Sequence, residues 1–123
     1  MELIHKELTG KIIQAFYEVH NTLGPGYLES VYQNALKIEL EEEIDLKCEM
    51  ERTVKIFYRN KKVGEHRLDL VVENKVIVEL KAVAEFHPAH QAQAISYLKA
   101  SGLKVVLLVN FGKDKVEYKR LVL

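Results

Sequence analysis

The segment at residues 76–81, VIVELK, constrains the fold of this chain more than any other stretch. Its β-branched residues predict a strand with a buried face, yet it carries the opposite charges of Glu79 and Lys81 two positions apart. Successive side chains of a strand point to opposite faces, so Glu79 and Lys81 share one face. The other face is apolar and consists of Val76, Val78 and Leu80.

The segment before it, residues 66–72, alternates in the same way. Its pattern predicts Leu68, Leu70 and Val72 on one face and Asp69 on the other. Both segments therefore have one apolar face and one face with a carboxylate, and the turn between them decides which faces coincide.

The register of this hairpin follows from the length of the turn. A two-residue turn would place Leu70 opposite Glu79, which mixes apolar and charged side chains on both faces. A three-residue turn, Glu73 to Lys75, pairs Leu70 with Val78 and sets Asp69 beside Glu79. Register follows the hydrophobic pattern, so we predict the second arrangement or an equivalent bulge.

Two carboxylates on facing strands destabilise the sheet by a few tenths to about 1 kcal/mol unless another group compensates them. Lys81 offers part of that compensation, and a divalent cation would offer more, because hard cations bind carboxylate oxygens. A solvated strand face with ordinary charge pairs explains the same three residues equally well. The hairpin alone leaves both interpretations open.

The rest of the chain alternates between helical and strand patterns without a linker or a repeat, and we interpret residues 1–123 as one domain. Apolar spacing predicts a second helix with a core stripe of Leu28, Val31, Ala35 and Ile38. The pattern predicts an α/β (α+β) fold in the order ααβββαββ, with helices at 9–22, 27–43 and 87–102 and strands within 49–83, 104–112 and 115–123.

Composition limits the classes of function. Lys and Arg number 18 and Asp and Glu also number 18, so the chain lacks the net positive charge of a general nucleic-acid binder. Any nucleic-acid site must be a local patch. The single cysteine, Cys48, cannot form an internal disulfide, and the first residues, MELIHKEL, have no signal-peptide pattern, so we expect a cytoplasmic protein.

Asp69 followed by Glu79-Leu80-Lys81 on the next strand resembles the PD-(D/E)XK nuclease superfamily, and GEHRLD and QAISY resemble the flanking motifs of its RecB-like members. The segment GYLESVY, residues 26–32, is similar to the signature of the GxxExxY protein family through Gly26, Glu29 and Tyr32. The resemblance covers nearly the whole chain. It implies a restriction-endonuclease-like core, with a central mixed sheet of about five strands flanked by helices.

The resemblance also implies roles for individual residues. Asp69, Glu79 and the backbone carbonyl of Leu80 would hold Mg²⁺ or Mn²⁺, and Lys81 would orient the attacking water and stabilise charge on the phosphate. Glu29 would be a second or water-mediated metal ligand. Two further residues, Gln93 and Tyr97, would line the substrate groove.

Some of these residues have simpler explanations. Glu29 could be a first-turn carboxylate stabilised by the helix dipole. Tyr97 could pack in the core with its hydroxyl in water. His90 has no partner at metal-ligand spacing, so we expect a surface histidine.

The sequence therefore supports two functions of different classes. One is a metal-dependent nuclease that hydrolyses nucleic-acid phosphodiester bonds, with DNA favoured over RNA as the partner and no membrane involved. The other is a non-catalytic binding module on the same fold, acting through a protein or nucleic-acid partner. A homodimer is an expectation from the frequency of two-fold assemblies only.

Overall fold

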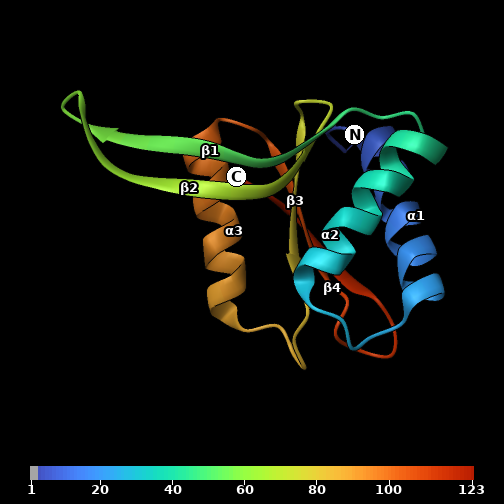
Figure 1. Cartoon of the computed structure of the whole chain (residues 1–123). Helices are drawn as coiled ribbons and strands as arrows, with labels where there is room; N and C mark the ends of the chain where they lie inside the picture. Colours follow the sequence, from blue (N-terminus) through green and yellow to red (C-terminus); the bar gives the residue numbers. More distant parts are fainter. Residues whose placement is uncertain (1–2) are drawn as a thin grey trace.

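Five strands form one mixed sheet in the order β1-β2-β3-β4-β5 in the computed structural model, which describes residues 3–123 (Figure 1). Strands β3 and β4 are parallel, and the other neighbours are antiparallel. The strands are β1 (Cys48–Tyr58), β2 (Lys61–Val72), β3 (Val76–Lys81), β4 (Val105–Asn110) and β5 (Glu117–Val122).

Helices cover both faces of the sheet. They are α1 (Lys6–Leu23), α2 (Glu29–Ile38), a π-helical turn η1 (Glu39–Glu43) and α3 (Pro88–Ser101). α1 ends at Gly24, with φ 68°, and α3 starts with Pro88 at its first turn. The predicted order ααβββαββ is confirmed, with η1 as an addition. In the part of the chain described, no helix has the length and apolar character needed to cross a membrane.

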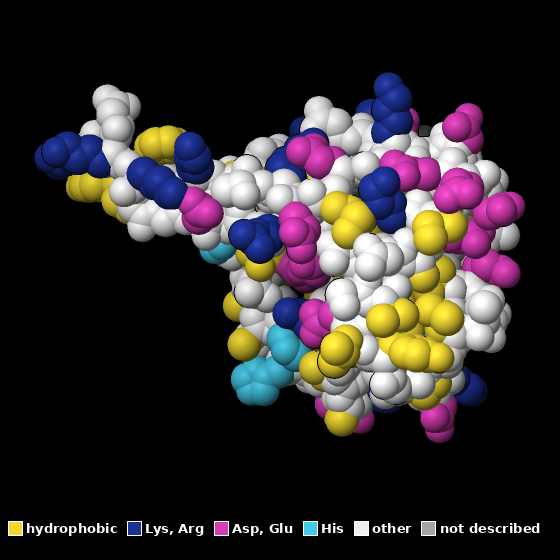
Figure 2. Space-filling view, viewed as in Figure 1, with side chains coloured by type: hydrophobic (Ala, Val, Ile, Leu, Met, Phe, Trp, Pro, Cys, Tyr) yellow, Lys and Arg dark blue, Asp and Glu magenta, His cyan; other side chains and the backbone are white. Residues whose placement is uncertain are grey.

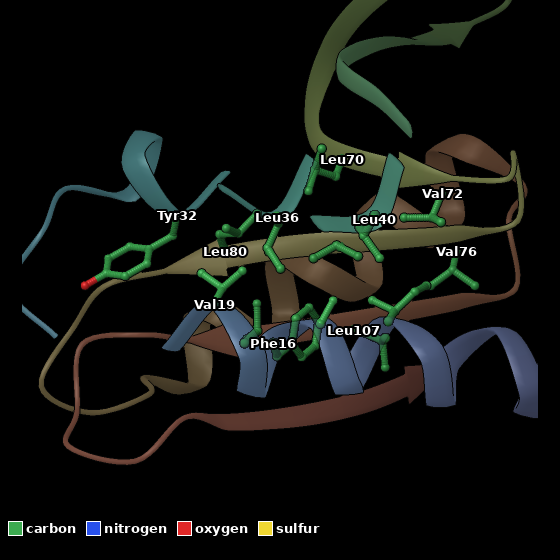
Figure 3. Packing of buried hydrophobic residues seen from close by; sticks show 14 of the residues in the cluster. Phe16, Val19, Tyr32, Leu36, Leu40, Leu70, Val72, Val76, Leu80 and Leu107 are labelled. Carbon is green, nitrogen blue, oxygen red and sulfur yellow. The ribbon is translucent and has the colours of Figure 1, made fainter. Parts of the chain in front are cut away.

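Two hydrophobic clusters lie on opposite sides of the sheet. The larger one joins α1 and α2 to the sheet through residues such as Phe16, Leu36 and Val78, and Figure 3 shows its centre. The smaller one joins α3 to the sheet through Leu98, Ile77 and Val106. Strands β3 and β4 contribute to both clusters, which is why their side chains are almost all buried.

The predicted core stripe of α2 was wrong by one position. Tyr32, Leu36 and Leu40 are fully buried, whereas Leu28 and Ile38 are 78% and 55% exposed. Two stripes of apolar residues run along this segment at helical spacing, so periodicity alone could not decide which one faces the sheet.

The predicted faces of β2 were correct for Leu70 and Val72 and wrong for Leu68. Leu70 belongs to the cluster beneath α1 and α2, but Leu68 belongs to the cluster beneath α3. Between them, Glu51 on β1 has a left-handed φ of 55°, and it lies between the residues that pair with Leu70 and Leu68. This irregular backbone turns the ribbon at Asp69, so the simple alternation of faces ends there.

Beyond this point β1 and β2 pair only with each other, because the pairing of β2 with β3 stops at Leu70. We call residues 52–67 the arm. It closes through a two-residue turn at Arg59 and Asn60, both with positive φ, and it projects from the body of the molecule (Figure 1).

Candidate active site

The β2–β3 hairpin has the predicted register. Leu70 pairs with Val78, and the turn contains Glu73 and Asn74, each with φ 53°. The backbone N–H of Lys75 donates to the carbonyl of Val72 at 3.0 Å. The prediction that Leu70 and Val78 share the apolar face is confirmed, because both belong to the larger cluster.

Asp69 and Glu79 lie together where β2 leaves β3. The N–H of Leu80 donates to Asp69 Oδ2 at 2.9 Å, so this carboxylate replaces the backbone acceptor that β2 no longer supplies. Glu79 is only 2% exposed, and its Oε2 has no hydrogen-bond partner. A buried polar atom without a partner is uncommon, since leaving it so costs about 1–3 kcal/mol.

The burial of Glu79 and the nearby carboxyl group of Asp69 change the ionisation of Glu79. The pKa of Glu79 is raised to about 10, first by burial and then by a hydrogen bond to Asp69 and by the negative charge of Asp69. The positive charge of Lys81 opposes them and is the weaker influence. Without a cation, the protonated form of Glu79 is therefore favoured at neutral pH.

The backbone carbonyl of Leu80 points toward the same place. In a strand, the N–H and C=O of one residue point to the same edge, and the N–H of Leu80 points at Asp69. The next carbonyl, that of Lys81, points the other way and accepts the N–H of Phe111 at 2.9 Å. The Leu80 oxygen thus lies on the side of the two carboxyl groups.

Lys81, Gln93 and Tyr97 meet beside this pair on the side of α3. Lys81 Nζ donates to Gln93 Oε1 at 3.3 Å. Tyr97 is 6% exposed, and burial followed by the charges of Glu79 and Asp69 raises its pKa to about 12. The tyrosine therefore keeps its proton at neutral pH and can act as a donor.

The loop that follows Lys81 is held by β4. Asn110 is fully buried, accepts the N–H of Val83 at 3.0 Å and donates to its carbonyl at 2.9 Å. A Cβ added at Gly112 would lie 2.5 Å from the Val83 nitrogen, so only glycine allows this approach. These contacts fix the chain between Lys81 and α3.

Glu29 is the first residue of α2 and is exposed at the rim of the site. Its negative charge is the smallest of the influences on the raised pKa of Glu79, after burial and Asp69. Its position is fixed by Tyr32, whose hydroxyl donates to the Gly24 carbonyl at 2.6 Å. The ring of Tyr32 also stacks on Phe111, with 4.6 Å between centroids.

Sequence reasoning gave no role to two residues that contact this region, Gln33 and His66. Gln33 Nε2 donates to the Asp69 carbonyl at 2.8 Å, which ties α2 to the point where β2 bends. His66 packs against Tyr97, with 4.8 Å between ring centroids. The only signal for Gln33 was its position one turn after Glu29 on the same helix face.

His90 stands at the rim with Glu29 and Lys81. Its pKa is lowered, first by burial and then by the charge of Lys81. Its Nδ1 accepts the N–H of His87 at 3.0 Å, so the neutral ring carries its proton on Nε2.

The donor set fits a hard divalent cation. Within residues 3–123, no three side chains of the His, Cys, Asp and Glu types form a ready metal cluster. The candidate ligands are instead two carboxyl groups and one main-chain oxygen, with the unpartnered Glu79 Oε2 among them. Oxygen donors of this kind suit Mg²⁺ or Mn²⁺ better than a soft metal. Figure 2 shows acidic, basic and histidine side chains gathered in the hollow below the arm.

Comparison with solved structures bears on the fold of the chain. The crystal structure of SSO0001 matches 76% of this chain with a TM-score of 0.55 and 17% sequence identity. The match covers 48% of that chain, so the protein described here spans less than half of its length. At this identity the likeness concerns the fold, a mixed sheet flanked by helices. None of the curated proteins compared with the chain matches it.

The family follows from the sequence itself. The family model of the PD-(D/E)XK nuclease superfamily matches residues 6–121. The chain therefore belongs to the PD-(D/E)XK nuclease superfamily, and its sheet and helices form the restriction-endonuclease-like core of that superfamily.

Proposed function

We propose that this protein is a metal-dependent nuclease that hydrolyses phosphodiester bonds of nucleic acids. The observation that carries the proposal is Glu79, which is buried beside the partly exposed Asp69 and whose Oε2 has no hydrogen-bond partner. A fold that needed only stability would gain from an apolar residue at position 79, since a buried polar atom without a hydrogen-bond partner costs about 1–3 kcal/mol.

Asp69, Glu79 and the backbone carbonyl of Leu80 are the proposed ligands of Mg²⁺ or Mn²⁺. A cation held there polarises the phosphoryl oxygen and lowers the pKa of a water molecule. The hydrogen bond from the Leu80 N–H keeps Asp69 directed at the site. Glu79 must release its proton to become a ligand, and a neighbouring cation favours that release.

Lys81 is the proposed donor to the scissile phosphate and the residue that orients the attacking water. Gln93 accepts from its ammonium group at 3.3 Å and holds it on the α3 side of the carboxyl pair. Tyr97 donates its hydroxyl proton along the same groove. Glu29 acts from the rim as a second or water-mediated ligand.

The finer family is part of the proposal. We infer that the chain is a GxxExxY protein, because each residue of that signature has a physical task here. Gly26 has a φ of 112°, which glycine tolerates best, and Tyr32 holds the start of α2, the helix that begins with Glu29.

The setting of the protein is also proposed. Residues 1–123 act as one nuclease domain with DNA favoured over RNA as substrate. Burial raises the pKa of the Cys48 thiol to about 11, which supports an unreactive cysteine in the reducing cytoplasm. The homodimer remains a prediction.

The test is cleavage of labelled single-stranded, duplex and branched DNA and of RNA, each with Mg²⁺, with Mn²⁺ and with EDTA. We expect cleavage of at least one substrate with a divalent cation and none in EDTA. Asp69→Asn should abolish it, because the amide keeps an acceptor for Leu80 but loses the charge that binds the cation. Glu42→Gln, a neutralised carboxylate on the exposed surface of η1, is the matched control and should cleave like the parent.

Absence of cleavage on all four substrates by a folded parent protein would reject the nuclease and favour the binding module. Equal cleavage by the parent and by Asp69→Asn would reject the assigned site.

A further inference from the structure

The arm, residues 52–67, is the most basic segment of the molecule. It carries six Lys or Arg side chains and one acidic side chain, Glu65, hence a net charge of +5. The whole chain has a formal net charge of zero, so the remaining residues carry −5. The overall composition hides this separation of positive and negative charge, because the two totals cancel. Figure 2 shows it, because the basic side chains lie on an arm that projects from the body.

Most of these cations are available to a partner. Among the described residues 3–123, Lys62 pairs with Glu65 and Arg52 with Glu49. The other four cations make no ion pair within this part of the chain: Lys55, Arg59, Lys61 and Arg67. Lysines on exposed strand edges protect against aggregation. That protection favours lysine in particular, but it does not explain the three arginines of the arm, Arg52, Arg59 and Arg67.

The cations lie on both faces of the ribbon. Phe57 pairs with Lys62 and Lys55 pairs with Glu65, which places these side chains on one face. Tyr58 pairs with Lys61 on the other face, and the Arg59 guanidinium lies 5.4 Å from the centre of the Tyr58 ring. A surface that contacts phosphates on one side only would not need cations on both faces.

The tip of the arm is also apolar. Phe57, Tyr58 and Val63 are 59%, 62% and 63% exposed. A two-stranded ribbon with so little burial is marginal by itself in water. The arm is held at its root, where His66 packs on Tyr97 and contacts Ser96 of α3. Packing of the core therefore does not explain why the tip carries these exposed apolar side chains.

The root of the arm is the candidate active site. Arg67 precedes Asp69 by two residues, and His66 touches Tyr97, which faces the carboxyl pair. From Asp69 to the turn at Asn60 the ribbon extends about 30 Å at roughly 3.3 Å per residue. A substrate bound at Asp69 and Glu79 would therefore lie beside the root of this ribbon.

We propose that the arm binds double-stranded DNA by lying in its major groove while an adjacent phosphodiester occupies the carboxyl site. The proposal rests on the nuclease function proposed above and adds duplex DNA as the substrate class. A two-stranded β-ribbon fits the major groove of B-form DNA. Phosphates line both sides of that groove, which matches cations on both faces of the arm. The major groove of duplex RNA is too deep and narrow for such a ribbon.

The experiment measures binding without cleavage. The full chain is titrated against labelled duplex DNA, single-stranded DNA and duplex RNA of equal length, in EDTA and at several salt concentrations. We expect duplex DNA to bind more tightly than either of the others. Its affinity should fall steeply with salt, because each phosphate contact adds about 0.9 to the logarithmic slope.

Two triple variants with the same net charge separate the arm from general electrostatics. Lys55→Ala/Lys61→Ala/Lys62→Ala removes cations from the arm, and Lys99→Ala/Lys104→Ala/Lys115→Ala removes exposed cations elsewhere. The arm variant should lose about tenfold to a hundredfold in affinity for duplex DNA, with a salt slope lower by about 2–3. The control variant should stay within about threefold of the parent. Melting curves show whether both variants are folded.

Equal loss in the two variants, or equal binding of duplex RNA and duplex DNA, would overturn the proposal. So would tighter, arm-dependent binding of single-stranded DNA, which would indicate base stacking on Phe57 and Tyr58 instead. Because binding is measured in EDTA, a protein that binds duplex DNA through the arm but cleaves nothing would support this inference and reject the nuclease.

Discussion

At the residue scale, Glu79 shows how one side chain can be costly for the fold and useful for a site. A glutamate that is 2% exposed and lies beside an aspartate is protonated in the absence of a cation, with a pKa near 10. The unfolded chain has an ordinary glutamate pKa of 4.5 at this position. The folded protein must therefore take up a proton at neutral pH.

This uptake gives the folding stability a defined dependence on pH. Because the folded-state pKa is raised, the contribution of Glu79 is complete below pH 4.5 and is lost as the pH rises toward 10. Glu79→Gln removes the dependence, since the amide needs no proton to donate to Asp69. In EDTA we expect the variant to match the parent near pH 4.5 and to be more stable by about 2–3 kcal/mol at pH 7. Urea unfolding at several pH values measures this, and parallel pH profiles for the two proteins would contradict it.

Lys81 is the residue whose loss should separate catalysis from folding. Its side chain is partly exposed and bonds to Gln93, so Lys81→Ala should keep the fold. Loss of one preorganised donor at the phosphate typically lowers the rate about a hundredfold to a thousandfold. Cleavage time courses with Mn²⁺ measure the effect, with Lys99→Ala on the exposed face of α3 as the matched control. Cleavage at the parent rate by folded Lys81→Ala would refute its role.

At the element scale, the start of α2 is fixed by buried contacts that its sequence pattern does not show. The Tyr32 hydroxyl donates to Gly24 and accepts the N–H of Tyr27 at 3.2 Å, and Gln33 holds the backbone of Asp69. Through these two residues the helix is attached both to the loop before it and to the strand that bends at the site. The position of Glu29 depends on both attachments.

Tyr32→Phe tests the first of them. The variant keeps the ring stacked on Phe111 and removes only the hydroxyl, so the Gly24 carbonyl loses its donor. We expect a loss of about 1–2 kcal/mol in unfolding free energy, the usual cost of an unmade buried hydrogen bond. Cleavage should fall as well, because the first turn of α2 is no longer held in place. Tyr17→Phe on the exposed face of α1 is the control. Parent-like stability of Tyr32→Phe would show that the hydroxyl bonds contribute nothing.

At the scale of the whole molecule, binding of a cation and folding are coupled. A ligand that binds the folded state alone stabilises it by about 2.7 kcal/mol at a hundred times its dissociation constant. We expect Mn²⁺ or Mg²⁺ to raise the melting temperature of the parent. The rise should vanish in Asp69→Asn and persist in Glu42→Gln. An equal rise in parent and Asp69→Asn would place the cation elsewhere.

Local sequence determined the elements and the hairpin register. The β-branched runs, the Gly24 and Gly102 helix ends and the three residues of the turn after Val72 act within a few residues of chain, so their consequences could be predicted. The register of the two neighbouring strands also brought Asp69 close to Glu79, one residue beyond the last pair, Leu70 and Val78.

Only the tertiary structure decided the rest. Which of two apolar stripes of α2 faces the sheet depends on where the helix packs, and the periodicity of the helix is the same for both. The change of face between Leu70 and Leu68 depends on the left-handed backbone at Glu51 of the facing strand. The burial of Glu79 and the contacts of Gln33 and His66 arise where segments distant in sequence meet. The sequence supplies these side chains, but their surroundings, and hence their chemistry, come from long-range packing.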